Sequence, residues 1–166
     1  VVEYQANVIA SVLAERLRGT YKMLHLPDGL SQDSLHMLMT CEPQIKEISD
    51  LISRTDVLLF GIGTAMHMAD QRHIADEVRK QLVDNHAVGE ALGQYCDMDG
   101  KLIYSTNNIG LSLPDVAKVP NVIAVAGGQE KASAIIGVMR ACQKGILIID
   151  EQAAEGMRQL LQISAL

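Results

Sequence analysis

The chain has 166 residues, of which 48% are hydrophobic and 20% charged, so it can bury the core of about one domain. Lys and Arg number 14 against 20 Asp and Glu. The formal charge of −6 argues against contact between this segment and a nucleic-acid backbone. The longest apolar runs are far shorter than the roughly 20 residues that cross a bilayer, so no membrane partner is expected.

The three cysteines, Cys41, Cys96 and Cys142, are odd in number, widely spaced and without a CxxC pair. This pattern predicts reduced thiols in a cytoplasmic protein, and neither a disulfide framework nor a zinc site. The first residues contain no basic stretch followed by an apolar run, so we expect no secretory signal. Because the chain starts at Val1 rather than Met, we expect it to be a segment of a longer polypeptide.

The first part of the chain predicts helices from apolar residues at helical spacing and strands from short apolar runs. The expected elements are a helix over 5–18, a strand over 22–26, a helix from Ser31 or Ser34 to Met39, a helix that starts at Pro43, and a strand over 57–60. The last of these, Val57–Phe60, is apolar on both faces, which is typical of a buried parallel strand.

The second part continues the alternation of strands and helices. The expected elements are a weakly patterned helix over 66–82, a hairpin over 95–104 with its turn at Asp99-Gly100, an irregular stretch over 107–120 with one short strand, a strand over 121–125, a helix over 130–142, a strand over 146–149 and a helix over 151–162. This order predicts an α/β fold, Rossmann-like, with a mainly parallel sheet flanked by helices. The hairpin is expected to be the one antiparallel insertion.

Two strand ends carry glycine turns, and ligands of open α/β sheets bind beyond the carboxyl ends of the strands. The first turn is Gly61–Thr64. The second comprises Gly127 and Gly128, with Lys131 in the first turn of the following helix. Backbone N–H groups, a helix N-terminus and a lysine favour a phosphate there. The same residues also fit a tight strand–helix turn with a solvated lysine, and this reading stays open.

Other ligand signatures are incomplete. Met66 occupies the place of the third glycine of a dinucleotide fingerprint, and no Walker lysine is present, so neither NAD nor ATP is expected. The histidines are scattered without an HExxH motif, so no metal is expected. Asp84, His86 and Glu90 form a group suited to acid–base chemistry or to binding ligand hydroxyls, and their spacing does not choose between the two.

Three stretches, 61–72, 84–93 and 122–132, together resemble the effector-binding domain of SorC-type transcriptional regulators. The similarity runs from Val1 to Glu155. It implies a domain of the ribose-5-phosphate isomerase and glucosamine-6-phosphate deaminase type that senses a phosphorylated sugar for a repressor of carbohydrate or glycolytic genes. Residues 1–166 would be the C-terminal part of this domain, whose N-terminal part and DNA-binding domain lie outside the chain.

The resemblance also implies the ligand, the partners and the site. The effector would be fructose-1,6-bisphosphate or a related phosphosugar, with no further cofactor. It would control both operator binding through the N-terminal domain and the assembly of a homo-oligomer, a dimer or tetramer. The implied contacts are a phosphate at Gly127, Gly128 and Lys131, a phosphate or sugar oxygen at Arg72, sugar hydroxyls at Glu90, and the sugar or a phosphate at Gln5.

The related deaminases carry a Gly-Ile-Gly-x-Asp-Gly-His signature that ends in Glu. Here Ala65 stands at the position of the catalytic aspartate and Arg72 at that of the glutamate. Ala65 cannot transfer a proton and Arg72 stays protonated, so we expect a sensor rather than an enzyme. His86 and Glu90 keep an isomerase- or deaminase-like enzyme as the alternative. A purely structural oligomerisation domain is a third reading, which would leave Lys131 without a role.

Overall fold

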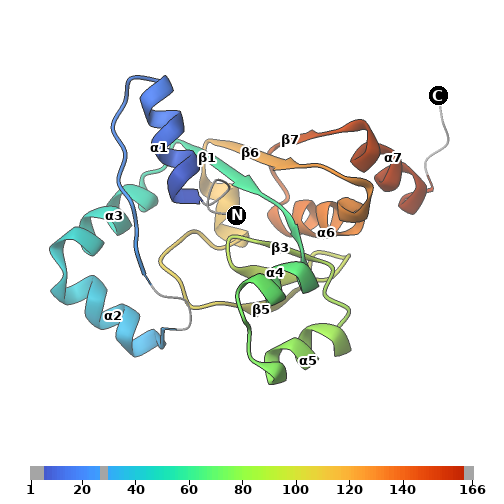
Figure 1. Cartoon of the computed structure of the whole chain (residues 1–166), viewed down its shortest axis with the longest axis horizontal. Helices are drawn as coiled ribbons and strands as arrows, with labels where there is room; N and C mark the ends of the chain where they lie inside the picture. The colour runs from blue at the N-terminus through green and yellow to red at the C-terminus, as the bar shows by residue number, and fades with distance from the viewer. Residues whose placement is uncertain (1–5, 27–29, 163–166) are drawn as a thin grey trace.

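The structure is a computed structural model that describes residues 6–26 and 30–162. The elements form a helical N-terminal part and a body built around β-sheets (Figure 1). The helices, in chain order, are α1 (Ala6–Arg16), α2 (Gln32–Cys41), α3 (Pro43–Ser53), α4 (Ala65–Gln71), α5 (Asp76–Asp84), the 3-10 helices η2 (Pro114–Lys118) and η3 (Gln129–Lys131), α6 (Ala132–Cys142) and α7 (Glu151–Leu160).

Within the described residues the strands form a parallel sheet, ordered β1-β6-β7, and an antiparallel sheet, ordered β2-β3-β4-β5. Their bounds are β1 (Val57–Gly61), β2 (Gly63–Thr64), β3 (Gly89–Ala91), β4 (Gln94–Cys96), β5 (Leu102–Ser105), β6 (Asn121–Ala126) and β7 (Ile146–Ile149). The parallel strands alternate with helices in the sequence, which confirms the predicted α/β class.

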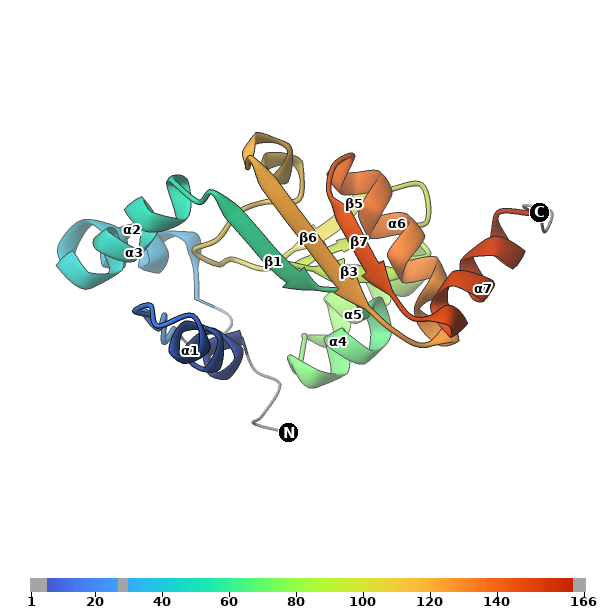
Figure 2. The same ribbon diagram turned by 90° about the horizontal axis from the view of Figure 1, so that it is seen from above.

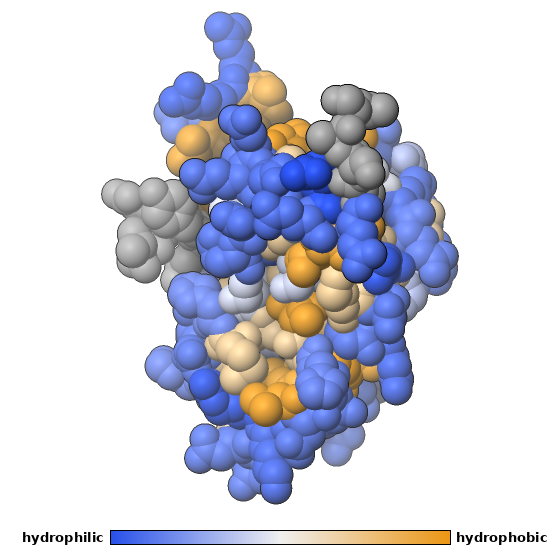
Figure 3. Space-filling model, turned by 90° about the vertical axis from the view of Figure 1, so that its right-hand side faces the viewer, coloured by the Kyte–Doolittle hydropathy of each residue, from blue (hydrophilic) through white to orange (hydrophobic). Residues whose placement is uncertain are grey.

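The main core lies on one face of the parallel sheet, where α6 packs with α7 and η2. Phe60, Val122 and Ala124 point from the strands toward Ile135 and Val138 of α6, and all five are buried. The opposite faces of these strands are exposed, so the expectation that Val57–Phe60 is buried on both faces is wrong within the described chain. From the side of α7, hydrophilic residues form most of the surface and apolar residues show in its middle (Figure 3).

The antiparallel sheet is larger than the sequence predicts. The expected hairpin is confirmed as β4 and β5, but β2 and β3 extend it to four strands. Leu92 and Gly93 form the two-residue turn between β3 and β4, and both have positive φ, as a type I′ turn requires. The sequence does not predict this turn, because leucine is uncommon at positive φ.

The N-terminal part contains the predicted helices but not the predicted strand. Ser31 is the N-cap of α2 and accepts a hydrogen bond from the Ser34 N–H, and Pro43 opens α3 as expected. Residues 22–26 have no ladder partner within the described ranges, so the apolar residues there form an extended segment instead.

The predicted helix over 66–82 is divided into α4 and α5. The break lies at His73, which has a φ of 49°, a conformation that ends a helix. The stretch 107–120 contains η2, and the structure forms no strand within it. No helix among the described residues combines the length and the apolar character that a membrane span requires.

Candidate functional site

The parallel register brings the two predicted glycine turns together. Gly61 lies opposite Val125, and the Ile62 N–H donates to the Val125 carbonyl at 3.2 Å. The chain therefore leaves β1 and β6 at the same edge of the sheet, where β2 lies close to η3. This edge is where an α/β sheet binds ligands.

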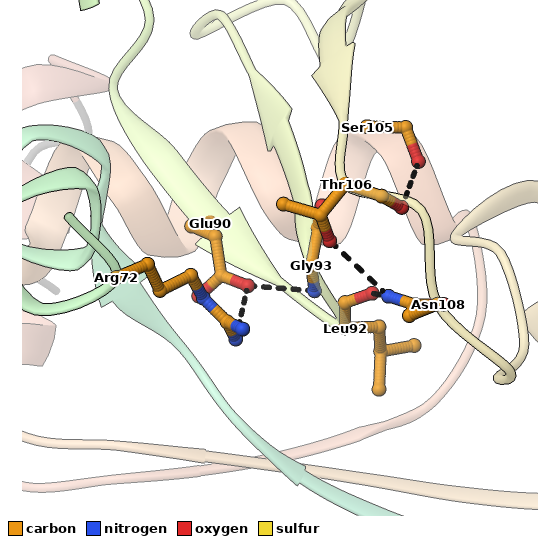
Figure 4. A network of polar contacts seen from close by, with 7 residues as sticks. All are labelled: Arg72, Glu90, Leu92, Gly93, Ser105, Thr106 and Asn108. Atoms are coloured by element: carbon orange, nitrogen blue, oxygen red, sulfur yellow. Dashed lines mark hydrogen bonds and ion pairs between the residues drawn. The ribbon is translucent and has the colours of Figure 1, made fainter. Parts of the chain in front are cut away.

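Arg72 and Glu90 form an ion pair beside this edge (Figure 4). Arg72 Nη2 lies 3.3 Å from Glu90 Oε1, although the two residues come from different elements. Arg72 follows the last turn of α4, and Glu90 is the central residue of β3, paired with Gly63. The Arg72 side chain is 28% exposed and the Glu90 side chain 4%, so the carboxylate is covered while part of the Arg72 side chain reaches the surface.

The Glu90 carboxylate also closes the β3–β4 turn. Its Oε1 accepts a hydrogen bond from the Gly93 N–H at 2.6 Å. Burial raises the pKa of Glu90 above the ordinary 4.5, while the Arg72 charge and the hydrogen bonds from Gly93 and Arg72 offset part of this rise. Glu90 is thus a fixed hydrogen-bond acceptor, held by two donors, next to the glycine turn of β1 and β2.

The raised pKa predicts a pH dependence of stability. The folded state binds a proton at Glu90 more readily than the unfolded state does. The free energy of unfolding therefore increases as the pH falls through the folded-state pKa toward 4.5, the ordinary value that applies to the unfolded chain. We expect Glu90→Gln to remove this gain. Urea unfolding of both proteins between pH 8 and 4.5 measures it. An unchanged pH slope in the variant would contradict the assignment.

At the second glycine turn, Gly127 and Gly128, one backbone N–H that was expected to bind a phosphate already has a partner in the protein. The Gly128 N–H donates to both carboxylate oxygens of Asp150, at 3.1 and 2.9 Å, so it is not free for a ligand. Asp150 also caps α7 by accepting from the Ala153 N–H. Gly128 has a φ of 96°, which requires glycine. Lys131 is the last residue of η3 and the N-cap of α6, just before the helix rather than in its first turn as expected. Its side chain is half-buried, and it makes no ion pair with other residues of the described chain.

A pocket of about 350 Å³ is lined in part by Arg72. Arg72 is the predicted site residue among those that line it; the lining residues are Leu30, Arg72, His73, Ile74, Ala75, Val78, Tyr104, Thr106 and Asn107. Thr106 Oγ1 donates to the Gly93 carbonyl at 3.0 Å, and Asn108 Nδ2 donates to the Leu92 carbonyl at 3.0 Å (Figure 4). The loop after β5 therefore lines the pocket with Thr106 and is hydrogen-bonded to the β3–β4 turn at Leu92 and Gly93.

Sequence reasoning missed this loop. The polar cluster from Thr106 to Asn108 was its only signal, and it lies at the start of the stretch over 107–120 that was expected to be irregular. Gln5, in contrast, was predicted as a site residue and lies outside the described residues.

The groups considered for catalysis are dispersed. Ala65 is buried, and His67 is exposed and hydrogen-bonded to Gln71 at 3.0 Å. Asp84 and His86 are exposed, and neither bonds to the Glu90 carboxylate in the described part of the chain.

The buried cysteines are poor nucleophiles. Burial raises the pKa of Cys96 to about 12 and that of Cys142 to about 11, so both thiols stay protonated near neutral pH. Within 6–26 and 30–162, no group of three or more His, Cys, Asp or Glu side chains is placed to hold a metal ion.

Comparison with known proteins gives this geometry a context. Residues 1–159 match the family described as "Putative sugar-binding domain". The chain is 38% identical over 154 residues to the central glycolytic genes regulator of Bacillus subtilis, which covers 93% of this chain and 45% of the regulator. It is 27% identical to the deoxyribonucleoside regulator of the same organism, over 93% of this chain and 50% of that protein. The chain therefore spans about half the length of these relatives.

Solved structures agree with the family assignment. A SorC family transcriptional regulator from Enterococcus faecalis superimposes with a TM-score of 0.85 at 38% identity, over 95% of this chain and 64% of that one. The full-length sorbitol operon regulator of Klebsiella pneumoniae has a TM-score of 0.79 at 22% identity, over 95% and 51%, and so shares the fold. These relatives are named as transcriptional regulators. The chain belongs to the family of sugar-binding domains of SorC-type transcriptional regulators.

Proposed function

We propose that this chain is the phosphosugar-sensing domain of a bacterial repressor of carbohydrate or glycolytic genes. The observation that carries the proposal is the buried Glu90 carboxylate, held by Arg72 at the edge of the sheet where the second glycine turn presents Lys131. A carboxylate accepts hydrogen bonds from sugar hydroxyls, and guanidinium and ammonium groups bind phosphate. One molecule that carries both hydroxyls and phosphate satisfies all three side chains.

The proposed contacts follow from the chemistry of each group. Arg72 has a partly exposed side chain, and a guanidinium binds phosphate oxygens in a bidentate manner. Lys131 supplies a cation at the start of α6, next to Gly127 and Gly128. Gln5 is assigned to the sugar or a phosphate from the family resemblance alone. Fructose-1,6-bisphosphate is the first candidate effector, because the 38% identical relative is named as a regulator of central glycolytic genes.

The regulatory output is proposed for the whole protein in the cytoplasm. Effector binding at the sheet edge would shift the arrangement of subunits in a homo-oligomer and thereby the affinity of a separate DNA-binding domain for its operator. The shift is limited by the difference in effector affinity between the two arrangements. The negative charge of the present segment fits this division of labour, since DNA contact is left to another part of the polypeptide.

A thermal melt tests the proposal. We expect fructose-1,6-bisphosphate to raise the Tm selectively, because a ligand that binds only the folded state stabilises it by mass action. Fructose-6-phosphate, glucosamine-6-phosphate and inorganic phosphate are the comparison ligands. An equal shift with every phosphate would indicate a general anion site, and the absence of any shift, in this chain and in the intact polypeptide, would refute the proposal.

A further inference from the structure

The glycine turn after β6 is built around a carboxylate of the protein itself. Asp150 follows β7 and accepts the Gly128 N–H on both of its carboxylate oxygens, at 3.1 and 2.9 Å. A Cβ on Gly127 would lie only 2.7 Å from Asp150 Oδ2, so Gly127 leaves the space that this oxygen occupies. Gly128, with its φ of 96°, adopts the backbone conformation in which its N–H meets the carboxylate. The seat of Asp150 therefore requires both glycines.

Helix α7 is attached to the same turn at two points. Asp150 is the N-cap of α7, and its Oδ1 accepts the Ala153 N–H at 2.8 Å, so one side chain joins the helix to the turn. The second point is the buried Gly156, in the middle of α7. A Cβ there would lie 2.9 Å from Ala132 Cβ and 3.1 Å from the Gln129 carbonyl oxygen. The backbone of α7 thus packs directly against η3 and the start of α6.

The place of Lys131 depends on this attachment. Lys131 is the last residue of η3, and its N–H donates to the Gly128 carbonyl at 3.1 Å, so it bonds to the residue that Asp150 holds. β6 lies between β1 and β7, and Figure 2 shows α7 beyond β7, on the side away from β1. On the β1 side, η3 lies close to β2, which pairs with β3, the strand of Glu90. Asp150 therefore holds η3 from the β7 side, opposite to the side from which β2 approaches it.

A lysine on such a short element needs support from its surroundings. A 3-10 helix of three residues has poor hydrogen-bond geometry, and lysine has a flexible stem, so neither fixes the ammonium group in space. A binding group contributes its full affinity only when neighbouring residues hold it in place. We propose that Asp150 is a positioning residue of the effector site, whose carboxylate fixes Gly128 and η3 so that Lys131 meets the phosphate. This inference rests on the proposed function, because that function assigns Lys131 to a phosphate.

Asp150→Ser tests the proposal in the intact polypeptide. Serine is also a good N-cap for α7, but its single oxygen cannot replace Oδ2 as the acceptor of the Gly128 N–H. We expect the affinity for fructose-1,6-bisphosphate, measured by calorimetry, to fall roughly tenfold, the scale of a lost charge-assisted hydrogen bond to phosphate. Ser31→Ala is the matched control, because Ser31 caps α2 by accepting the Ser34 N–H. Both variants should lower the Tm by about 2–4 °C, but Ser31→Ala should bind normally.

A double-mutant cycle separates positioning from general destabilisation. Because Asp150 acts through Lys131, we expect Asp150→Ser to weaken binding much less when Lys131→Ala is already present. Equal losses in both backgrounds would overturn the proposal and leave Asp150 with a structural role alone.

The sign of the affinity change also decides between roles of Asp150. Higher affinity in Asp150→Ser would make the carboxylate a competitor of the phosphate and would overturn the proposal. Unchanged affinity in Asp150→Ser, together with a loss in Lys131→Ala, would refute the positioning role and leave the proposed function intact. Failure of the unsubstituted protein to bind fructose-1,6-bisphosphate would overturn both.

Discussion

Arg72→Ala is expected to remove the thermal stabilisation by fructose-1,6-bisphosphate and to lower the free energy of unfolding by about 3 kcal/mol. The two effects have different origins. The guanidinium is the proposed phosphate ligand, so its loss weakens effector binding. It is also the charged partner of the buried Glu90 carboxylate at 3.3 Å, and its removal leaves that carboxylate with the Gly93 N–H as its other donor.

A double variant separates these effects. Arg72→Ala with Glu90→Gln removes the buried charge, so we expect part of the lost stability to return while effector binding stays weak. Urea unfolding measures the stability, and calorimetry measures binding. Arg54→Ala is the matched control, because Arg54 is exposed at the end of α3 and bonds to the nearby Asp50 carbonyl. Normal effector affinity in Arg72→Ala would show that the site is misassigned.

Lys131→Ala is expected to weaken fructose-1,6-bisphosphate binding about tenfold or more while leaving the Tm unchanged. A charge-assisted hydrogen bond to phosphate contributes on the order of 1.5–3 kcal/mol, which corresponds to at least this factor. The fold does not depend on the ammonium group, since Lys131 makes no ion pair within the part of the chain that the structure describes.

The contrast with Arg72 makes the Lys131 result informative. Lys131→Arg keeps the charge, so we expect it to retain much of the affinity, whereas Lys80→Ala on exposed α5 removes a charge elsewhere and should bind normally. Titration calorimetry at fixed salt compares the three proteins, because phosphate binding weakens as salt screens the charges. Equal affinity in all three would support the reading of Lys131 as a solvated residue of a strand–helix turn.

Much of the fold could be predicted from the sequence because the periodicity of the parallel strands and their helices is local. Each of three predicted strands lies at a strand of the structure, namely Val57–Phe60, Asn121–Val125 and Ile146–Ile149. The failures depend on non-local partners or on rare backbone conformations. Residues 22–26 have the composition of a strand but no strand beside them within the described residues. His73 divides the predicted helix because it adopts a positive φ, which the helical pattern around it does not predict.

The sequence named individual residues of the candidate site but did not predict which of them contact one another. The resemblance named Arg72 and Glu90 separately, and only the structure pairs them through an ion pair between α4 and β3. The role of Asp150 was missed because it lies on β7's connection to α7 and meets Gly128 across the sheet edge. No spacing rule links two such residues, since the contact depends on the parallel register of β6 and β7.

The strand order also determines when the site can form during folding. The antiparallel sheet joins neighbouring segments, so β3, β4 and β5 can zip together by short loop closures. The β1–β6 pair instead joins Val57 to Asn121, a long closure that entropy delays. Arg72 and Glu90 belong to the early, local unit, whereas η3, whose last residue is Lys131, comes close to β2 only after this late step. The proposed effector site, which needs all three side chains, would therefore be complete only at the last stage of folding, when the parallel sheet is closed.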